Sequence, residues 1–580
     1  MKIKSLLIGM LACSAMVACT NEDPIDNGSE NPANGKNDAY VSVTFAMPET
    51  GGSRATSDGG YDVGNTTEQT IVVDKSIFLF YDANDNYVTF GNLVGQVTTN
   101  EDAQGNHSEH STLNTLDVNA KKGEAFIALS ASDNEINKIT QVLTVVNYSK
   151  VGGIADLKNK PLSYALSMTT NETSDPSNAG FLMTTSVYFD QEGELVQTTA
   201  ITEDNIAETQ TAALADPVKI YIERASAKVG LTATETDKIF EVDPEDKEDS
   251  NDENKEADIL FNGTLTPVSV KILGYVVNNT NTSTNLVKQV GSNWNTEGSI
   301  PFAGWNQYDN YRSYWAMGTE YGYDGFLTES TSTTTGEGET ATTTTTPNQH
   351  RLTVKSFNDA MTNAFTNMYC YEQTVEEANV VADRSTPVYY PNVTTVLIAG
   401  QILVGEATSG VTLYKYSGVF YDAANYQKLI KSRLTEYKKA DGASYQEDDW
   451  TVTLESNVAN PFNVTVSATG ATVNENDYSD IVAGTEVYTN GYCYYQIPIE
   501  HLQSGDDPTS DTEEENPIRY GVVRNHWYQL KVSGVKHIGE PVYNPGNPIP
   551  EIPEKDAAHY LAATIHVLSW HVVEQDVTLE

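Results

Sequence analysis

Cysteine and cationic residues are the scarce components of this chain. Its 580 residues include four cysteines, and Cys13 and Cys19 lie in the N-terminal leader. The other two, Cys370 and Cys493, are too few for a disulfide framework, and the sequence leaves open whether they pair. Lys and Arg number 34 against 80 Asp and Glu, a formal net charge of −46. That balance argues against nucleic acid as a partner, because such binding needs clustered cations.

Catalytic and metal-binding motifs are also missing. There is no Gly-x-Ser-x-Gly, His-Glu-x-x-His, P-loop or dinucleotide fingerprint. The nine histidines are scattered, and His107 with His110 lacks a second ligand pair at metal-binding spacing. A solvated loop is the simpler interpretation of that pair. His526 is predicted to be a hydrogen-bonded core residue. We therefore expect no enzyme, no metal and no other cofactor.

The N-terminus has the pattern of an exported lipoprotein. Lys2 and Lys4 precede the short apolar run Leu6–Ala18, which indicates a secretory signal rather than a spanning helix. The small residues before Cys19 resemble the bacterial lipobox, in which the cysteine is acylated and becomes the new N-terminus. The acidic pair Glu22–Asp23 resembles the surface-export signal of Bacteroidetes lipoproteins. An ordinary signal peptide with a chance cysteine is the alternative.

A first strand followed by an exposed loop comes next. Apolar side chains alternate strictly through Tyr40–Met47, which predicts a half-buried β-strand. A polar, glycine-rich loop behind it contains a lone basic residue, Arg54. A trypsin-like protease would have one target there, the Arg54–Ala55 bond. The apolar face of the strand would consist of Val41, Val43, Phe45 and Met47.

The remaining pattern is mainly β with a few short helices. The acidic segment Asp82–Asn86 predicts a hairpin turn, with a calcium loop as the alternative. One helix is predicted through Ile136, Ile139, Leu143 and Val146, and a second at Tyr426–Tyr437, with Leu429, Ile430 and Leu434 buried. Strands are predicted at 71–73, 77–81, 87–88, 126–129, 218–229, 268–277, 394–404, 451–454, 462–466 and 492–499.

The length of the chain predicts two domains. We place their boundary just before the strand at 218–229. The predicted divisions are a signal peptide (1–19), a tether with the first strand (20–54), two β-domains (55–216 and 217–543), and a final arm with a strand (544–580). The acidic run 241–258 and the Thr-rich stretch 331–347 are predicted to be solvated loops. A calcium site in the first and O-glycosylation of the second are alternatives.

The C-terminal end combines a stiff spacer with a β-rich tail. Five prolines between Gly539 and Glu554 favour an extended conformation. The tail Ala563–Glu580 would then be carried away from its domain and donated to a neighbour. Folding back onto its own sheet is the alternative. One face of the tail would hold Ile565, Val567, Val573, Val577 and Leu579, and the other Leu568, Trp570 and Val572.

Several segments resemble the fimbrillins of Bacteroidales, the type V pilins, and most closely the group of the short (minor) fimbria of Porphyromonas. The most specific is Tyr520–Leu530, followed by Gly539–Val542, which is similar to the end of the family's C-terminal domain. Gln373 is a mild departure from the family, which usually has asparagine there. The supporting matches are Phe181–Thr184, Arg224–Lys228, Arg312–Trp315 and Tyr369–Thr374.

The resemblance implies two transthyretin-like β-sandwich domains and a mode of assembly. A lipoprotein precursor reaches the outer membrane, and an Arg-specific protease cuts at Arg54–Ala55. The first strand and the lipid anchor then leave, and the C-terminal strand of another copy fills the groove. Copies join head to tail in an adhesive cell-surface fimbria with accessory tip and anchor subunits. Because this chain has both a cleavable loop and a donor tail, it is predicted to be a shaft subunit.

Two other functions fit parts of the sequence. A monomeric surface lipoprotein could bind glycans through exposed aromatics, since the chain has 33 tyrosines. That alternative explains neither Arg54 nor the Pro-linked tail. A β-sandwich hydrolase is the third candidate, and no motif supports it. The ligand of adhesion, on host or bacterial surfaces, stays open.

Overall fold

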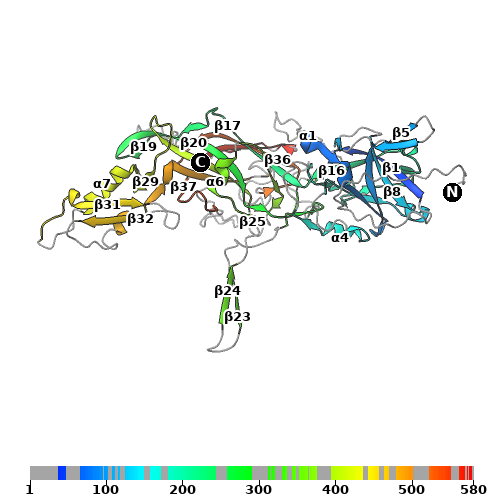
Figure 1. Cartoon of the computed structure of the whole chain (residues 1–580), viewed down its shortest axis with the longest axis horizontal. Coiled ribbons are helices and arrows are strands. Elements are labelled where there is room, and N and C mark those ends of the chain that lie inside the picture. The colour runs from blue at the N-terminus through cyan, green and yellow to red at the C-terminus, as the bar shows by residue number, and fades with distance from the viewer. Residues whose placement is uncertain are drawn as a thin grey trace.

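The structure is a computed structural model of the whole chain, and it forms an elongated molecule (Figure 1). The N-terminal strands lie at one end, and a small module with α7 lies at the other. The residues that the structure describes are 37–46, 66–95, 97–101, 107–111, 115–117, 124–148, 157–171, 180–242, 258–290, 311–313, 315–319, 330–335, 342–347, 352–363, 365–374, 393–434, 442–455, 463–468, 479–499, 501, 521–549, 561–568, 571–572 and 574–577.

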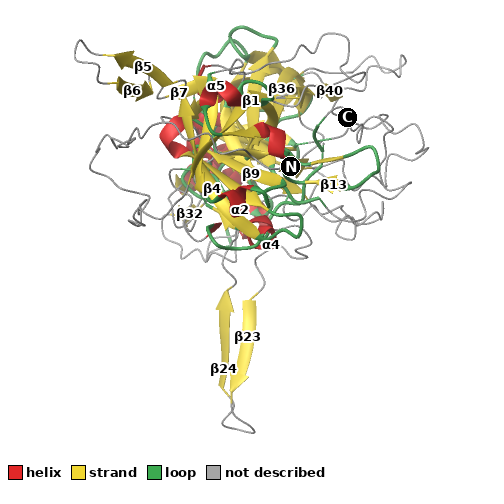
Figure 2. Cartoon of the chain, turned by 90° about the vertical axis from the view of Figure 1, so that its right-hand side faces the viewer, coloured by secondary structure: helices red, strands yellow, loops and turns green. Residues whose placement is uncertain are grey.

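The N-terminal half is built on a nine-stranded sheet in the order β11-β16-β1-β8-β4-β3-β9-β14, with β15 beside β1. β11 also pairs with β9, so the path from β11 through β1 to β9 closes into a ring. Figure 2 views this end of the molecule. The strands are β1 Asn37–Ala46, β3 Ser76–Tyr81, β4 Tyr87–Gly95, β8 Ala125–Ala131, β9 Gln141–Val146, β11 Met183–Thr185, β14 Thr199–Ala200, β15 Ile206–Ala207 and β16 Val218–Arg224.

Apolar side chains fill the ring and also cover part of its outside. The inner cluster includes Val41, Val43, Phe45, Phe78, Phe80, Ile127, Leu129, Val142, Val146, Ile220 and Ile222. An outer cluster on β3 and β9 packs against α4 (Leu162–Leu166). It includes Ile77, Leu79, Leu143, Val145, Leu162 and Ala165. The central strands β3 and β9 are therefore buried on both faces.

The helix predicted through Ile136 and Val146 is wrong. α2 (Asp133–Ile136) ends after one turn, and Gln141–Val146 forms strand β9. Val142 packs inside the ring and Leu143 packs outside it. A strand that is apolar on both faces lacks the alternation by which a half-buried strand is found.

The chain crosses between its two halves at Ala225, later than predicted. The strand predicted at 218–229 is two strands, because β16 ends at Arg224 and β17 (Ser226–Ala233) begins directly behind Ala225. β16 pairs with β1 and β11 in the N-terminal sheet, whereas β17 pairs with β26 and β36 in the next one. The pairing of β16 thus corrects the predicted boundary at 216/217.

The C-terminal half consists of two sheets that face each other across one core. The first has the order β26-β17-β36-β38-β40, and the second β33-β29-β30-β19-β20-β28-β34-β37. The core between them takes side chains from β17, β36, β20, β28 and β34. The first sheet contains β26 Met368–Tyr371, β36 His526–Val535, β38 Leu561–Leu568, β39 His571–Val572 and β40 Glu574–Val577. The second contains β18 Ile239–Glu241, β19 Asp258–Phe261, β20 Thr264–Asn278, β28 Thr395–Val404, β29 Leu413–Tyr416, β30 Val419–Tyr421, β33 Glu486–Tyr488, β34 Tyr492–Pro498 and β37 Glu540–Pro541.

Most of the remaining elements are short pairs and single turns. The turn predicted at Asp82–Asn86 is confirmed, because Asp82 Oδ1 accepts the backbone N–H groups of Asn84 and Asn86. The pairs are β2 Thr70–Val72 with β7 Thr115–Asp117, β5 Val97–Glu101 with β6 His107–Ser111, β10 Thr169–Thr170 with β22 Thr284–Asn285, β12 Tyr188–Phe189 with β13 Leu195–Val196, β21 Thr280–Asn281 with β25 Leu352–Thr353, and β27 Gln373–Thr374 with β35 Gly521–Val522. The other helices are α1 Thr66–Gln69, α5 Gln210–Ala213, α6 Phe357–Thr362 and α8 Ser479–Val482. Within the described residues, no helix is long and apolar enough to cross a membrane.

The Thr-rich stretch is a hairpin, where the sequence predicted a loop. β23 (Ser330–Thr335) pairs with β24 (Thr342–Pro347) over six residue pairs. Both views show the hairpin projecting from the body of the molecule (Figures 1 and 2). Threonine is β-branched and favours extended backbone, so a low-complexity run of this composition can pair with itself.

The module at the far end contains the predicted amphipathic helix. α7 (Ala423–Leu434) buries Tyr426, Ile430 and Leu434, and it packs on the hairpin of β31 (Trp450–Glu455) and β32 (Asn463–Ala468). The rings of Tyr414 and Tyr426 stack with centroids 4.9 Å apart. The helix prediction is confirmed, although the helix begins three residues earlier than expected and Leu429 is only partly buried.

Asp422 stands directly before α7, and its Oδ1 accepts the backbone N–H of Asn425 at 2.8 Å. Burial alone would raise its pKa, but hydrogen bonds from Asn425 and Asn262 outweigh burial and lower the pKa below 3.8. Replacing Asp422 with alanine should lower the free energy of unfolding by about 0.5–2 kcal/mol at neutral pH. Because the folded pKa is depressed, this contribution exists above pH 3.8 and disappears as the pH falls through the folded pKa. Thermal unfolding of both proteins at neutral and acidic pH should show the difference shrinking in acid.

Candidate functional site

Strand β1 is one of the strands that form the ring, and it lies between β8 and β16. It pairs antiparallel with β8 from Asn37↔Ala131 to Val43↔Ala125. On its other side it pairs with β15 and then, in parallel, with β16 from Val43↔Val218 to Ala46↔Tyr221. The first segment of the described chain is therefore an internal strand, hydrogen-bonded on both sides.

The predicted apolar face of β1 is confirmed as far as the structure describes it. Val41 and Val43 are fully buried and Phe45 is 3% exposed. All three belong to the cluster inside the ring, where the Phe45 and Phe78 ring centroids lie 6.2 Å apart. Met47 lies outside the described residues. Three such side chains contribute roughly 5–9 kcal/mol through burial, at about 1.5–3 kcal/mol each.

The opposite face of β1 contains a buried polar group. Ser42 is 0% exposed, and its hydroxyl has no hydrogen-bond partner. An unsatisfied buried hydroxyl costs about 1–3 kcal/mol. β1 therefore contributes three well-packed apolar residues to the inside of the ring and one poorly accommodated residue on its opposite face.

The C-terminal tail lies on its own sheet. β38 pairs antiparallel with β36 from Trp527↔Leu568 to Val535↔Leu561, and β40 pairs with the outer edge of β38. The sequence predicted a strand carried away from its domain, so the single chain adopts the alternative arrangement. Among the predicted donor residues, Ile565, Val567 and Leu568 lie in β38, Val572 in β39 and Val577 in β40; Trp570, Val573 and Leu579 lie outside the described residues.

The proline-rich arm is bound to the body for its first half. Ile549 is 8% exposed, and its carbonyl accepts hydrogen bonds from Asn278 Nδ2 at 3.0 Å and Gln496 Nε2 at 3.3 Å. Its N–H donates to the carbonyl of Lys355 at 2.8 Å. Asn278 is itself fully buried, and its Oδ1 accepts the N–H of Lys355. The spacer before β38 thus starts from a fixed point at Ile549.

A buried charged network joins the two halves. Arg524 and Glu372 form a fully buried ion pair through two nitrogens of the guanidinium. Arg524 also donates to the carbonyls of Asn285 and Leu286 and to the Thr284 hydroxyl. Burial alone would lower the pKa of Arg524, but the charge of Glu372 outweighs burial and raises it. Each of the three guanidinium nitrogens of Arg524 therefore donates to an acceptor in the protein.

Two further ion pairs lie in the same junction. Lys288 Nζ lies 2.7 Å from Glu223 Oε2 and donates to the Ser313 carbonyl, with both charged side chains fully buried. Burial lowers the pKa of Lys288 despite its carboxylate partner. Glu68 Oε1 lies 2.8 Å from Lys228 Nζ and accepts the Tyr369 hydroxyl at 2.7 Å.

Asn525 links three of the segments. Its side-chain oxygen accepts a hydrogen bond from Arg224, and its carbonyl accepts one from Arg312. Asn525 has a positive φ of 60°, a conformation that asparagine tolerates better than most residues. The residue therefore turns the chain and receives two arginines at the same place.

The segments that carry the family resemblance meet at this junction. Arg224–Lys228, Arg312–Trp315, Tyr369–Thr374 and the 520–530 segment all contribute to the network, and Phe181 packs against Tyr369 with ring centroids 4.9 Å apart. Sequence reasoning found these segments but not their partners Glu68, Glu223 and Lys288. No local signal marks those three, because each is an ordinary charged residue in a strand, a short helix or a loop.

His526 is buried as predicted. Its Nδ1 lies 2.8 Å from the Arg524 carbonyl, and its ring lies 5.0 Å from that of His501. His501 Nδ1 lies 2.8 Å from the Tyr528 hydroxyl, which accepts the backbone N–H of Val523. These contacts hold the turn before β36 in place. In the described part of the chain, no group of three or more His, Cys, Asp or Glu side chains is arranged to hold a metal ion.

Cys370 and Cys493 are both buried and both free. They stand on facing sheets, on β26 and β34, and belong to the same core cluster. Burial raises the pKa of each thiol to about 12. The question that the sequence left open is thus answered in favour of two unpaired thiols.

Buried thiols of raised pKa should react slowly with disulfide reagents. At about pH 8 the folded chain starting behind Cys19 should show almost no reaction with Ellman's reagent, and two fast equivalents should appear in denaturant. Two missing equivalents in denaturant without reductant would reveal a disulfide and contradict the structure.

The other predicted site residues, Cys19 of the lipobox and the Arg54–Ala55 bond, lie outside the described residues. The structure therefore defines the strand before the predicted cut and not the cut itself. Of the segments predicted to be functional, β1 is the one whose position the structure describes most fully.

The comparisons with known proteins bear on the C-terminal part. Residues 486–576 match the family model described as "Major fimbrial subunit protein type IV, Fimbrillin, C-terminal". The C-terminal region of the chain is that of a fimbrillin. The match spans β33, β34, β36 and β38, so the matched region includes two of the strands that line the core of the facing sheets, the Arg524 turn and most of the tail.

Two solved structures are similar to this chain at a low level. One is a candidate cell adhesion protein from Bacteroides eggerthii, with 10% identity and a TM-score of 0.29, covering 94% of this chain and 98% of the other. The second is the tip fimbrial protein Mfa3 from Porphyromonas gingivalis with C-terminal truncation, with 10% identity and a TM-score of 0.28, covering 93% and 99%. No curated protein matches. The match of residues 486–576 to the family model supports a fimbrial subunit, and the strands of the structure show a mainly β fold.

Proposed function

We propose that this fimbrillin is a shaft subunit of a cell-surface fimbria, exported as a lipoprotein through Cys19, activated by cleavage at Arg54–Ala55, and polymerised by strand exchange. The observation that carries the proposal is that β1 is one strand of a closed ring. A closed ring has no free edge, so it does not polymerise by strand addition. Removing β1 creates two edges, on β8 and β16, and empties the places of Val41, Val43 and Phe45.

A ring that has lost β1 would strongly favour the binding of another strand in its place. Departure of β1 exposes the inner cluster at a cost of roughly 5–9 kcal/mol, with roughly 0.5–1.5 kcal/mol for each ladder hydrogen bond that is lost. A strand from outside recovers both terms by β-augmentation. Cleavage at Arg54–Ala55 separates β1 from the rest of the chain. After the cut, no covalent bond connects β1 to the other strands of the ring.

The C-terminal tail is the proposed incoming strand. β38 has eight residues, β1 has ten, and β38 forms an outer part of its sheet with only β40 beyond it. An outer strand leaves a sheet at lower cost than an internal one, because it breaks one main ladder. The fixed point at Ile549 lets the tail swing without disturbing the body. Donation from copy to copy is a heterologous contact that does not close, so it builds a filament.

The proposal is tested by following cleavage and polymer size together. Limited trypsin treatment of the purified precursor should yield a new N-terminus at Ala55 and, with it, an SDS-resistant ladder. The variant Arg54→Ala should keep β1 and stay monomeric. Removal of residues 561–580 should allow the cut but abolish the ladder. Cleavage at Ala55 without any ladder would refute strand exchange for this chain.

Ser42 offers a graded test of β1 release. Because its hydroxyl is buried and unsatisfied, Ser42→Ala should stabilise the precursor by about 1–2 kcal/mol and slow ladder formation after the cut about tenfold. The matched control is Thr44→Ala, since the Thr44 side chain is only half-buried. Thermal unfolding and the rate of ladder growth measure both effects. Equal rates of ladder growth in the two variants would show that the stability of β1 in the ring does not limit assembly.

A further inference from the structure

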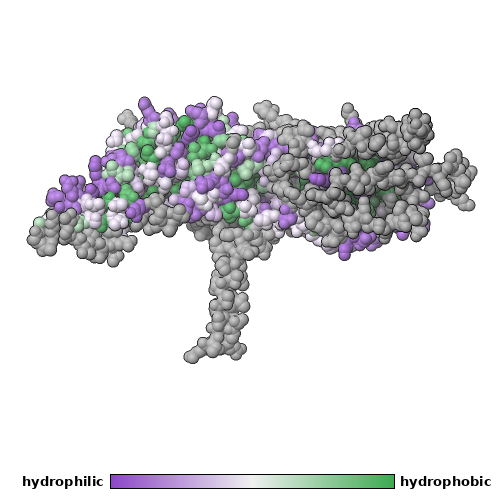
Figure 3. Space-filling view, viewed as in Figure 1, coloured by the Kyte–Doolittle hydropathy of each residue, from purple (hydrophilic) through white to green (hydrophobic). Residues whose placement is uncertain are grey.

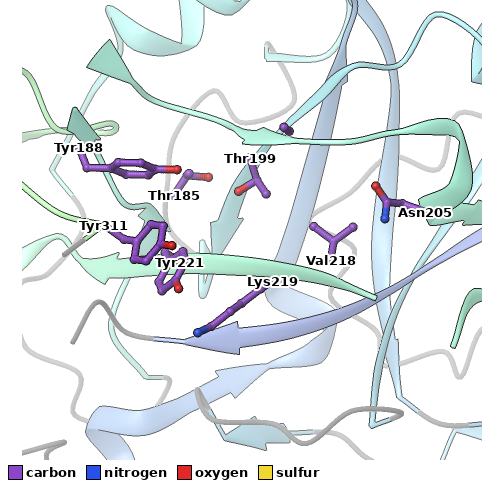
Figure 4. A pocket seen from close by; sticks show the side chains of 9 residues that line it. Thr185, Tyr188, Thr199, Asn205, Val218, Lys219, Tyr221 and Tyr311 are labelled. Carbon is purple, nitrogen blue, oxygen red and sulfur yellow. The ribbon is translucent and has the colours of Figure 1, made fainter. Parts of the chain in front are cut away.

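A tyrosine-lined pocket lies on the outside of the ring, where the loop at Tyr311 reaches the N-terminal half. The cavity has a volume of about 330 Å³. Its walls come from β11, β12, β14, β16 and the Tyr311 segment. Figure 4 shows three tyrosines gathered at one side, with Asn205 and Val218 at the other and the Lys219 side chain running toward the tyrosines. The residues lining it are Thr185, Tyr188, Thr199, Ala200, Asn205, Val218, Lys219, Tyr221 and Tyr311.

The three tyrosines hold one another in fixed positions. The rings of Tyr221 and Tyr311 stack, with centroids 4.0 Å apart and an interplanar angle of 9°. Tyr188 meets Tyr311 edge to face at 5.4 Å. The Tyr311 carbonyl accepts the Ser186 hydroxyl at 2.8 Å, which ties the incoming loop to the strand end behind β11. The aromatic wall is therefore preorganised rather than formed on binding.

Apart from Ala200 and Val218, the other described lining residues are polar, and one of them carries a charge. Lys219 is exposed, and its Nζ lies 4.7 Å from the centre of the Tyr221 ring. Thr199 in the wall is half-buried, whereas Thr185 is buried and its hydroxyl accepts the backbone N–H of Thr144 at 2.9 Å. Asn205 is fixed from behind, because its Nδ2 donates to Asp216 and its Oδ1 accepts from Thr202. The pocket thus combines rigid aromatic rings with hydroxyl and ammonium groups.

We propose that this pocket binds a neutral sugar residue of a glycan. Sugars present apolar C–H faces that pack on aromatic rings and hydroxyls that both donate and accept hydrogen bonds. The pocket offers partners for both, and its volume lies near the lower end of the range of about 300–1,000 Å³ for small-molecule sites. That size suits one terminal sugar unit rather than an extended oligosaccharide.

The charges near the pocket favour a neutral ligand over an anionic one. Lys219 is the only cation among the described lining residues, while Asp216 lies behind Asn205 and Asp190 directly follows β12. None of the nine described lining residues carries a carboxylate. The chain as a whole has a net charge of −46, which disfavours anions further. Lys219 then serves as a hydrogen-bond donor to a sugar oxygen.

The site is compatible with a polymeric protein. A single small pocket with a few hydrogen bonds gives weak binding, and repetition along a filament multiplies it by avidity. The pocket does not depend on strand exchange, however, because all its residues are in place in the uncleaved chain. The sugar test can therefore fail or succeed independently of the proposed shaft function.

The test is saturation-transfer NMR on the uncleaved precursor with methyl glycosides of glucose, galactose, mannose and fucose. At least one should show saturation transfer, and its Kd should rise at least tenfold in Tyr188→Ala and in Lys219→Met. Lys219 is exposed, so its variant should retain the fold even if the tyrosine variant does not.

The matched control is a second lysine–tyrosine pair outside the pocket. Lys160 Nζ lies 5.4 Å from the ring of Tyr164, which is 41% exposed. Tyr164→Ala and Lys160→Met should leave sugar binding unchanged. The proposal is overturned if no neutral glycoside shows transfer, if only methyl glucuronide or sialic acid does, or if the pocket variants bind as well as the control variants.

Discussion

Replacing Glu372 with alanine is expected to lower the free energy of unfolding by about 3–5 kcal/mol. Glu372 and Arg524 are both fully buried, and the substitution leaves the guanidinium without its carboxylate in the interior. An uncompensated buried charge is among the most destabilising single changes in a protein. Urea unfolding followed by tryptophan fluorescence measures the loss.

The matched control is the surface pair of Lys415 and Glu486. Its atoms lie 2.9 Å apart, close to the spacing in the buried pairs, but its side chains are 34% and 39% exposed. Glu486→Ala should therefore change the free energy of unfolding by no more than about 1 kcal/mol. If both alanine variants lost the same small amount, burial of the Glu372–Arg524 pair would not make it more important for stability than a surface pair.

A chain that begins at Ala55 is expected to form an SDS-resistant ladder without any protease. It lacks β1, so the β8 and β16 edges and the inner cluster stand open from the start. The cost of the open ring, roughly 5–9 kcal/mol from three side chains, favours capture of a tail from another copy. Gel electrophoresis without boiling and electron microscopy show the product.

The control for that chain is the same protein ending at residue 560. It should stay monomeric or precipitate without forming a ladder, because it has a groove but no donor. A ladder in the absence of residues 561–580 would show that another segment is exchanged. The tail would then remain what it is in the single chain, an outer strand of its own sheet.

The sequence predicts those elements whose side chains face one buried surface. Val41, Val43 and Phe45 alternate with polar or small residues, and β1 lies where the alternation predicts it. α7 repeats its apolar residues at helical spacing and is found within a few positions of the predicted bounds. In both cases one face meets the core and the other meets a different environment, so the periodicity is visible.

The errors arise where that condition fails. β9 is apolar on both faces, so Leu143 and Val146 matched a helical spacing by coincidence. The crossing at Ala225 is not marked by a glycine, proline, asparagine or aspartate, and only this one residue separates the two strands. The Thr-rich stretch has the composition of a loop, but the β-branched side chains of threonine favour extended backbone, and the stretch forms a hairpin.

The charged junction could be predicted only in part. The segments around Arg224, Glu372 and Arg524 were recognised by resemblance, yet nothing local shows that a charged residue is buried. The pairing of Lys288 with Glu223 joins residues that lie 65 positions apart, and only the folded chain brings them together. The same is true of the pocket, in which Tyr311 reaches Tyr188 and Tyr221 from the other half.

The most direct test of the account is capture of the tail by an opened ring. The precursor ending at residue 560 is cut at Arg54, and a fluorescent peptide of residues 561–580 is added while the released β1 fragment is followed by mass spectrometry. The account predicts that one peptide binds per chain as one β1 fragment leaves, and that Ile565→Asp with Val567→Asp in the peptide prevents both. If β1 stays in the ring and the peptide remains free at any concentration, polymerisation by this tail is contradicted.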